Sequence, residues 1–452
     1  MGELAEAFLH TVSNYPDDIA VSDGSRALTF AQLRDAAQAC SGAGEGPVLI
    51  ECDRSVDTIV RIVGAILAGR AFVPLDPEMP AAKRAAIEET LASGVPEGAL
   101  AVIFTSGSTG RPKGVAKGEA SYLAFIRAFC ATFDLGHDEV VGNQTPFFFD
   151  ASSKDLLLMM YAGARLEIIP SRLFGLPMEL INYLNERAVT YACWVPSAYS
   201  VVSQLHAFEE VVPTTLRHTH FVGEAFPLDH LRAWMNAVPQ ASYVNLYGST
   251  ELAGICCFCR LDPARHYATL PMGEALAGCE VFLADGDALV AGPGATGEIC
   301  VAGDTLAIEY LGDPEGTAKR FVEMQTPSGR VTRVLRTGDL ARIDEDGEMV
   351  FSGRSDYQIK HMGRRIELQE IEVVAQELPE IDLCCCAYDT RRQRIVMFCL
   401  LAPEVELAAR EVRRLLKGHL SSYMVPGRVF VLDEMPRNAN GKIDRAALNA
   451  RL

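Results

Sequence analysis

The residues whose types and spacing point most directly to chemistry form a loop of glycines and hydroxyls that is closed by a lysine. The loop reads TSGSTGRPKG over residues 105–114 and follows the apolar run 101–104. Glycines let backbone N–H groups approach an anion closely, and the hydroxyls and Lys113 add donors and one positive charge. The pattern therefore predicts a loop that holds a polyphosphate. It lacks the G-x-x-x-x-G-K-[ST] spacing of a Walker A loop, and the alternative is an ordinary surface loop rich in Gly and Ser.

A lone aspartate after three aromatic residues is a second candidate. The segment PFFFDASSK spans residues 146–154 and precedes the apolar stretch 156–161, which we expect to be helical. Asp150 could cap that helix, as could Ser152 or Ser153. Alternatively, Asp150 lines an apolar pocket, where a carboxylate needs a cationic partner such as an ammonium group. The residues alone do not decide between these two interpretations.

The segment VNLYGSTE, residues 244–251, repeats the order of strand, glycine, hydroxyls and acid. Tyr247 offers a flat face to a base, Thr250 offers a donor to a phosphate, and Glu251 is an oxygen ligand of the kind that Mg²⁺ prefers. The alternative for residues 248–251 is a tight turn and helix cap without a ligand.

Strands and helices alternate along the first half of the chain. Residues 48–52 read as a buried strand, 57–67 as an amphipathic helix and 71–75 as another strand, and the alternation continues to about residue 250. This order predicts an α/β fold with layered, largely parallel sheets. Two helices and two strands beyond residue 354 suggest a small α+β unit: helices 367–378 and 411–420, and strands 383–388 and 395–401.

Length, charge and cysteine content narrow the classes of protein. A chain of 452 residues suggests one large and at least one small domain, and its formal net charge of −18 argues against non-specific binding to nucleic acid or anionic membranes. The start of the chain has no signal peptide, and no apolar run approaches a membrane span. The chain has thirteen cysteines, six of them in clusters at 256–259 and 384–386. They suggest reduced thiols of a cytoplasmic protein rather than disulfides or a zinc site.

Six motifs together resemble the adenylate-forming superfamily, and within it a free-standing amino-acid adenylation domain of the nonribosomal peptide synthetase type. They are TSGSTGRPKG (105–114), NLYGSTE (245–251), YLGDPE (310–315), RTGDL (336–340), GRSD to GRRIEL (353–368) and PRNANGK (436–442). The resemblance covers residues 28–448. It implies a large N-terminal domain of layered α/β subdomains, residues 1–354, and a small mobile C-terminal α+β lid, residues 355–452.

The resemblance also implies a reaction. ATP, with Mg²⁺, and an amino acid would give an aminoacyl-adenylate and pyrophosphate, and the aminoacyl group would pass to the phosphopantetheine thiol of a separate carrier protein. Coenzyme A is the second choice of acceptor. The alternatives are an acyl-CoA or aryl-acid ligase of the same superfamily, or a non-catalytic nucleotide-binding protein.

Motif matching assigns roles residue by residue. Catalysis falls to Lys442, Thr250 and Glu251, with Glu251 as the Mg²⁺ ligand, Thr250 near the α-phosphate and Lys442 between the substrate carboxylate and that phosphate. Asp339 would accept hydrogen bonds from the ribose hydroxyls, and Asp356 is the hinge, with Lys360 and Gly363 on the thioester-forming face. The nucleotide would contact Thr105, Ser106, Gly107, Ser108, Thr109, Gly110, Lys113, Gly223, Glu224, Asn245, Tyr247, Gly248, Asp339 and Arg354.

In this resemblance, Asp150 would bind the α-ammonium of the amino acid, and aryl-acid and fatty-acid relatives lack this aspartate. The pocket would be lined by Asp150, Ala151, Lys154, Cys193, His220, Val222, Leu246, Gly254 and Ile255. A buried lysine needs a partner, so Lys154 suggests an acidic or polar side chain in the substrate. If Lys154 instead pairs with Asp155 or extends to solvent, a small neutral amino acid would fit. The segment 80–101 is shorter than is usual for the family.

Overall fold

The computed structural model describes residues 2–42, 44–105, 111–354, 358–437 and 443–452. The chain forms two compact units. The first comprises Met1–Pro77, Ser93–Ile103 and Val115–Ser355, and the second comprises Glu78–Ala92, Phe104–Gly114 and Asp356–Leu452. The last division falls one residue after the expected boundary, but two earlier segments group with the C-terminal part. The domain division that the sequence suggests therefore stays a prediction.

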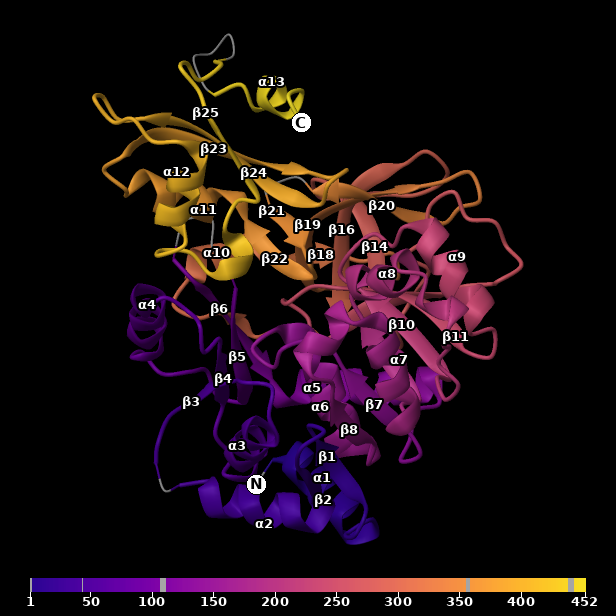
Figure 1. The fold of residues 1–452 in the computed structure, drawn as a ribbon. Coiled ribbons are helices and arrows are strands. Elements are labelled where there is room, and N and C mark those ends of the chain that lie inside the picture. The colour runs from indigo at the N-terminus through magenta and orange to yellow at the C-terminus, as the bar shows by residue number, and fades with distance from the viewer. Residues whose placement is uncertain (1, 43, 106–110, 355–357, 438–442) are drawn as a thin grey trace. The chain divides into compact units, whose positions relative to one another are not determined.

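A nine-stranded sheet dominates the first unit (Figure 1). Its strands, in spatial order, are β13 (Glu274–Ala275), β12 (Ile255–Arg260), β11 (Ser242–Gly248), β10 (His218–Val222), β9 (Tyr191–Trp194), β7 (Val140–Asn143), β8 (Arg165–Ile168), β1 (Ile19–Ser22) and β2 (Ala27–Thr29). The strands from β11 to β1 are parallel to their neighbours, whereas β2, β12 and β13 are antiparallel at the edges. Parallel strands end at one edge of a sheet, so the loops after β7, β9, β10 and β11 gather there.

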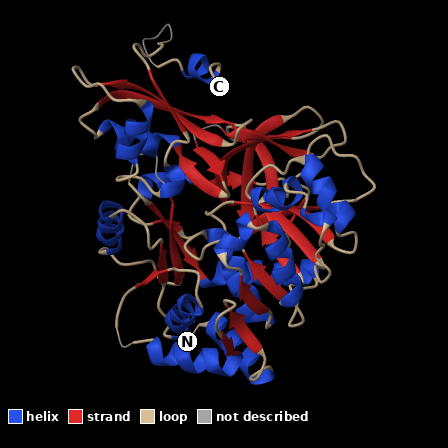
Figure 2. Cartoon of the chain, viewed as in Figure 1, coloured by secondary structure: helices blue, strands red, loops and turns tan. Residues whose placement is uncertain are grey.

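Alternation along the central strands divides their side chains between two cores. Ala192, Trp194, Phe221 and Tyr243 pack with α7 (Pro177–Glu186), α8 (Pro196–Gln204) and α9 (Leu228–Ala237). On the other face, Cys193, Val244 and Leu246 pack with α5 (Glu119–Phe133) and α6 (Ser153–Leu157). In Figure 2, helices accordingly lie against the strands of this sheet. The predicted pocket residues of β9 and β11 therefore share the α5 face.

Two smaller sheets lie largely within the first unit. One has the order β17 (Glu309–Tyr310), β6 (Lys113–Gly118), β5 (Ala99–Thr105), β4 (Phe72–Leu75) and β3 (Val48–Glu51). The other is antiparallel, with the order β15 (Ala288–Val290), β14 (Cys279–Asp285), β16 (Thr296–Gly303), β19 (Val331–Ile343) and β18 (Phe321–Gln325), and β20 (Met349–Arg354) pairs with β19.

Several local predictions are confirmed. The predicted helices and strands near the N-terminus form, and Thr29 caps α2 (Phe30–Cys40) in a capping box with Gln32. Further helices are α1 (Glu3–Asn14), α3 (Val56–Leu67) and α10 (Pro314–Arg320) in the first unit and α4 (Ala81–Leu91) in the second. Within the described residues all thirteen cysteines are free, and no helix has the length and apolar character of a membrane span.

The second unit has a three-stranded sheet and a hairpin. Its elements are β21 (Gln358–His361), β22 (Arg364–Glu367), α11 (Leu368–Gln376), β23 (Ile381–Asp389), β24 (Arg394–Leu401), α12 (Ala409–Leu416), β25 (Arg428–Val431) and α13 (Arg445–Asn449). Cys384 and Cys386 face the core under α11 and α12, whereas Cys385 faces the opposite side. Successive side chains of a strand point to opposite faces, so the three cysteines of 384–386 do not share one face of β23.

Candidate active site

A hairpin of the antiparallel sheet brings two predicted nucleotide residues together. Asp339 on β19 lies opposite Arg354 on β20, and the two side chains form an ion pair. The Tyr247 hydroxyl, at the end of β11, donates a hydrogen bond to the other carboxylate oxygen of Asp339, which is only 1% exposed. Burial, and then the Asp339 charge, raise the pKa of Tyr247 well above its usual range, so its phenol stays a donor.

Glu251 is held just beyond the same strand. Tyr310, from the motif YLGDPE, donates its hydroxyl to Glu251 at 2.8 Å, and the backbone N–H of Ala307 donates to the Glu251 carbonyl oxygen at 2.8 Å. Gly248 precedes a turn. A Cβ added to Gly248 would lie 2.4 Å from the Gly254 carbonyl oxygen, so the turn requires glycine there. The turn after β11 is followed by β12 rather than a helix, so the interpretation of residues 248–251 as a helix cap is wrong.

Asp150 is not a helix cap either. It begins a short 3₁₀ turn, Asp150–Ser152, which leads through α6 into a π-helical turn, Leu158–Ala162, and none of these turns has a side-chain cap. The carboxylate of Asp150 forms an ion pair with Lys117 on β6. Sequence reasoning assigned no role to Lys117, although a lysine within an otherwise apolar strand segment was a signal that could have identified it.

Lys154 pairs with the residue next to it. Its Nζ lies 3.2 Å from Asp155 Oδ1 and donates to the Ala151 carbonyl oxygen at 2.7 Å. Asn143 donates to the other Asp155 oxygen at 2.9 Å. Burial opposes the charge of Lys154, but the adjoining Asp155 carboxylate prevails and raises the Lys154 pKa above its usual value. The alternative in which Lys154 pairs with Asp155 is confirmed.

Replacing Lys154 by methionine is expected to destabilise the fold by about 3–5 kcal/mol, because Asp155 would be left buried without its cation. Burial already raises the Asp155 pKa, and loss of Lys154 would raise it further, so the destabilisation should grow as the pH rises above the ordinary aspartate pKa and shrink as the pH falls and Asp155 binds a proton. Urea unfolding of wild type and variant at several pH values measures this difference in the free energy of unfolding. A double variant that also carries Asp155→Leu should recover most of the loss, and a pH-independent penalty would contradict the assignment.

His220, one of the predicted pocket residues, is fully buried on β10. It pairs in register with Cys193 on the neighbouring strand, and its ring packs against Phe133 at 4.6 Å and Tyr191 at 5.0 Å between centroids. Neither ring nitrogen has a hydrogen-bond partner among the described residues, and burial keeps the His220 pKa well below its usual value. His220 is therefore neutral and offers one donor and one acceptor.

The other predicted pocket residues lie on adjoining strand ends. Val222 pairs in register with Leu246, and Ile255 pairs with Gly248. At Gly254, an added Cβ would lie 2.4 Å from the Phe125 ring, so a larger residue would collide with α5. Ala151 is half-buried beside Asp150.

The remaining predicted residues are dispersed or lie outside the described residues. Thr105 ends β5 and Lys113 begins β6, Glu224 accepts a hydrogen bond from the Ser197 N–H at 3.1 Å, and Asn245 donates to the Pro271 carbonyl oxygen at 2.8 Å. Gly223 has a positive φ of 99°, and Thr250 lies in the turn after β11. Lys360 and Gly363 belong to the β21–β22 hairpin. The predictions for Ser106, Gly107, Ser108, Thr109, Gly110, Asp356 and Lys442 fall outside the described residues.

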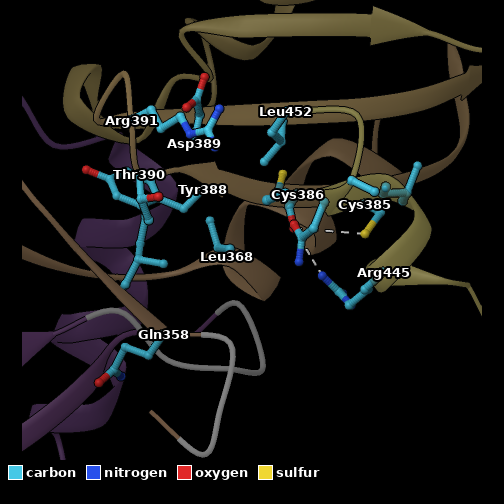
Figure 3. A pocket seen from close by; sticks show the side chains of 15 residues that line it. Gln358, Leu368, Cys385, Cys386, Tyr388, Asp389, Thr390, Arg391, Arg445 and Leu452 are labelled. Carbon is cyan, nitrogen blue, oxygen red and sulfur yellow. Dashed lines mark hydrogen bonds between the residues drawn. The ribbon is translucent and has the colours of Figure 1, made fainter. Parts of the chain in front are cut away.

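A hollow of about 570 Å³ lies within the second unit (Figure 3). Its lining includes none of the residues to which motif matching assigns a role. Gln358, Leu368, Tyr388 and Leu452 contribute to its lining. Arg445, also in the lining, bonds Glu372 at 2.7 Å and donates to the Cys386 carbonyl oxygen at 3.1 Å, so its charge is already neutralised.

Glu251 is the predicted Mg²⁺ ligand, and its surroundings fit that ion. Mg²⁺ commonly binds one or two carboxylates together with substrate phosphates and water, so a single buried carboxylate suffices. Among the described residues, three carboxylates lie within 4.8 Å of one another: Asp344, Asp346 and Glu348. They lie in the β19–β20 turn, where Glu348 and Asp346 pair with Arg265.

Comparison with known proteins identifies the family. The family model described as AMP-binding enzyme matches residues 82–311, which is more than half of the chain, and the AMP-binding enzyme C-terminal domain matches residues 370–442. The chain is 29% identical to surfactin synthase subunit 1 of Bacillus subtilis strain 168, over 98% of this chain and 14% of that protein. It is 28% identical to bacitracin synthase 1 of Bacillus licheniformis, over 98% of this chain and 9% of that protein.

A solved structure supports the same conclusion. The chain superposes with a TM-score of 0.84 and 25% identity on holo-PA1221, a nonribosomal peptide synthetase protein containing adenylation and PCP domains, over 99% of this chain and 84% of that chain. The chain thus spans most of this structure but less than a fifth of the two relatives' length. It belongs to the AMP-binding enzyme family, as an adenylation domain of the nonribosomal peptide synthetase type.

Proposed function

We propose that this chain activates an amino acid with ATP as an aminoacyl-adenylate, releases pyrophosphate, and then transfers the aminoacyl group to the phosphopantetheine thiol of a carrier protein. The observation that carries the proposal is that Tyr247 and Arg354, from two separate motifs, both contact the buried carboxylate of Asp339 from a third motif. A carboxylate accepts hydrogen bonds only, which suits the two hydroxyls of a ribose. Arg354 beside it supplies a cation near the nucleotide.

Activation is an attack of the acid's carboxylate on the α-phosphate, so the protein has to position two anions and neutralise their charge. Mg²⁺, when bound at Glu251, supplies part of that neutralisation. Tyr310 orients the Glu251 carboxylate by donating its hydroxyl, and Tyr247 stays protonated to hold Asp339. Lys442, carried by the second unit, is proposed to add the remaining positive charge between the carboxylate and the α-phosphate.

The pocket favours an uncharged amino-acid side chain. The acidic-substrate hypothesis depends on a Lys154 that is available to the substrate, whereas Lys154 is occupied by Asp155. The neutral imidazole of His220 leaves room for a polar but uncharged group. A small neutral amino acid is therefore the proposed class, with glutamate or aspartate as the alternative.

The carrier protein as acceptor is proposed from the relatives, because holo-PA1221 contains a PCP domain next to its adenylation domain. An assay that loads aminoacyl groups onto a phosphopantetheinylated carrier, with coenzyme A as the competing acceptor, distinguishes the two thiols.

Exchange of labelled pyrophosphate into ATP across the twenty amino acids is expected to be strongest with a small neutral amino acid. The activated carboxyl should also be trapped by hydroxylamine as a hydroxamate. Strongest exchange with glutamate or aspartate would restore the acidic-substrate alternative. Absence of exchange and hydroxamate with every amino, aryl and fatty acid offered would refute the proposed function.

A further inference from the structure

Asp150 already has a cationic partner in the protein. Lys117 on β6 forms an ion pair with it, and the Lys117 side chain is 0% exposed, whereas that of Asp150 is 14% exposed. The Tyr122 ring lies 5.3 Å from the Lys117 ammonium and packs the lysine in place. A substrate ammonium at Asp150 would therefore have to share the carboxylate with Lys117.

Among the residues that the structure describes, Asp150 is the carboxylate in contact with Lys117. The charge of Glu251 raises the pKa of both Lys117 and Asp150. The charge of Lys154 lowers the Asp150 pKa, but Lys154 itself pairs with Asp155. Burial keeps Tyr122 neutral by raising its pKa. Adding a substrate ammonium at Asp150 would place two cations on one carboxylate, and like charges repel strongly where water is excluded.

Burial acts on both members of the pair. It lowers the pKa of Lys117 and raises that of Asp150, in each case as the largest cause. The pair is thus costly to keep charged in this environment, and a second ammonium increases that cost.

We propose, resting on the function proposed above, that Lys117 is a specificity-determining residue whose ammonium competes with the substrate's α-ammonium for Asp150. The competition lowers the preference of the enzyme for α-amino acids over the same acids with an α-hydroxyl or with no α-substituent. These analogues lack the α-ammonium and so bring no second cation to Asp150, which keeps its ion pair with Lys117. They are therefore the additional class of substrate that this site accepts.

A purely structural role for Lys117 makes a different prediction. If the pair only fixes the Asp150–Ser152 turn against β6, removing Lys117 would lower activity with all acids by the same factor. The ratio of kcat/KM for an amino acid to kcat/KM for its analogue separates the two roles, because a uniform defect cancels in the ratio.

The test measures pyrophosphate exchange with the best amino acid of the panel, its α-hydroxy analogue and its α-unsubstituted analogue. A site built to bond a substrate N–H rejects an analogue that lacks it by about 10⁴–10⁵-fold. Wild type is expected to discriminate by less than about 10³-fold, and Lys117→Met should raise the ratio at least tenfold, toward that range. Lys117→Arg, the matched control, keeps the cation and should retain the wild-type ratio.

Several results would overturn the competition. An unchanged or lower ratio in Lys117→Met contradicts it, as does complete loss of exchange in a folded variant, which would make Lys117 necessary for catalysis. If the methionine variant does not fold, Lys117→Gln, which keeps a polar contact to Asp150, replaces it in the test. An increase in melting temperature on adding ATP shows that a variant is folded. If neither neutral variant folds, a wild-type ratio above about 10³ rejects the proposal. Wild type without exchange for any acid refutes the proposed function instead.

Discussion

Replacement of Asp339 by asparagine is expected to lower pyrophosphate exchange at least hundredfold in kcat/KM for ATP, which corresponds to about 2.7 kcal/mol. The asparagine side chain replaces one acceptor oxygen by a donor NH₂ group and carries no charge, so it can no longer accept a ribose hydroxyl at each of two oxygens. The change also removes the negative charge that pairs with the Arg354 guanidinium, which is 10% exposed. Thermal unfolding of the variant, with and without ATP, separates lost binding from lost structure.

Asp346→Asn is the matched control for this variant. Asp346 lies in the turn of the same β19–β20 hairpin, is exposed, and its carboxylate makes a long contact of 3.4 Å with Arg265. Surface substitutions of this kind usually change stability by no more than about 0.5 kcal/mol, so its exchange rate should stay within twofold of wild type. A folded Asp339→Asn variant with exchange within fivefold of wild type would show that Asp339 does not hold the nucleotide.

Glu251→Gln is expected to reduce exchange at least hundredfold at a fixed, low Mg²⁺ concentration and to raise the Mg²⁺ concentration for half-maximal rate about tenfold or more. Glutamine preserves the volume and can still accept from Tyr310, but it lacks the charge that a hard divalent cation prefers in its ligands. The measurement is a Mg²⁺ titration of exchange, with ATP binding followed separately.

Tyr310→Phe provides the comparison. It keeps Glu251 and removes only the hydroxyl that orients it, so its loss should be that of one hydrogen bond to a charged group, about tenfold. A Glu251→Gln variant with an unchanged Mg²⁺ dependence, and a rate no lower than that of Tyr310→Phe, would exclude Glu251 as the metal ligand.

Much of the fold follows from local pattern. The amphipathic helix and buried strands near the N-terminus and the α+β character of the C-terminal part were predicted because they depend on residues a few positions apart. The interruption of the helix after Asp150 was missed, and it replaces a regular helix by a 3₁₀ turn, an α-helical turn and a π-helical turn. Apolar periodicity does not distinguish these forms, because their side chains are buried on all sides.

The sequence by itself determined the family and the residues that terminate the strands of the large sheet, since motif order and strand-end glycines are properties of the chain. Only the tertiary structure decided which charges pair. Lys117 meets Asp150 across 33 positions and Tyr247 meets Asp339 across 92. Lys154, free to the substrate in one interpretation, turns to its neighbour Asp155. The physical reason is that a buried charge takes the partner that packing brings within reach, and packing joins segments whose spacing in sequence carries no record of their distance in space.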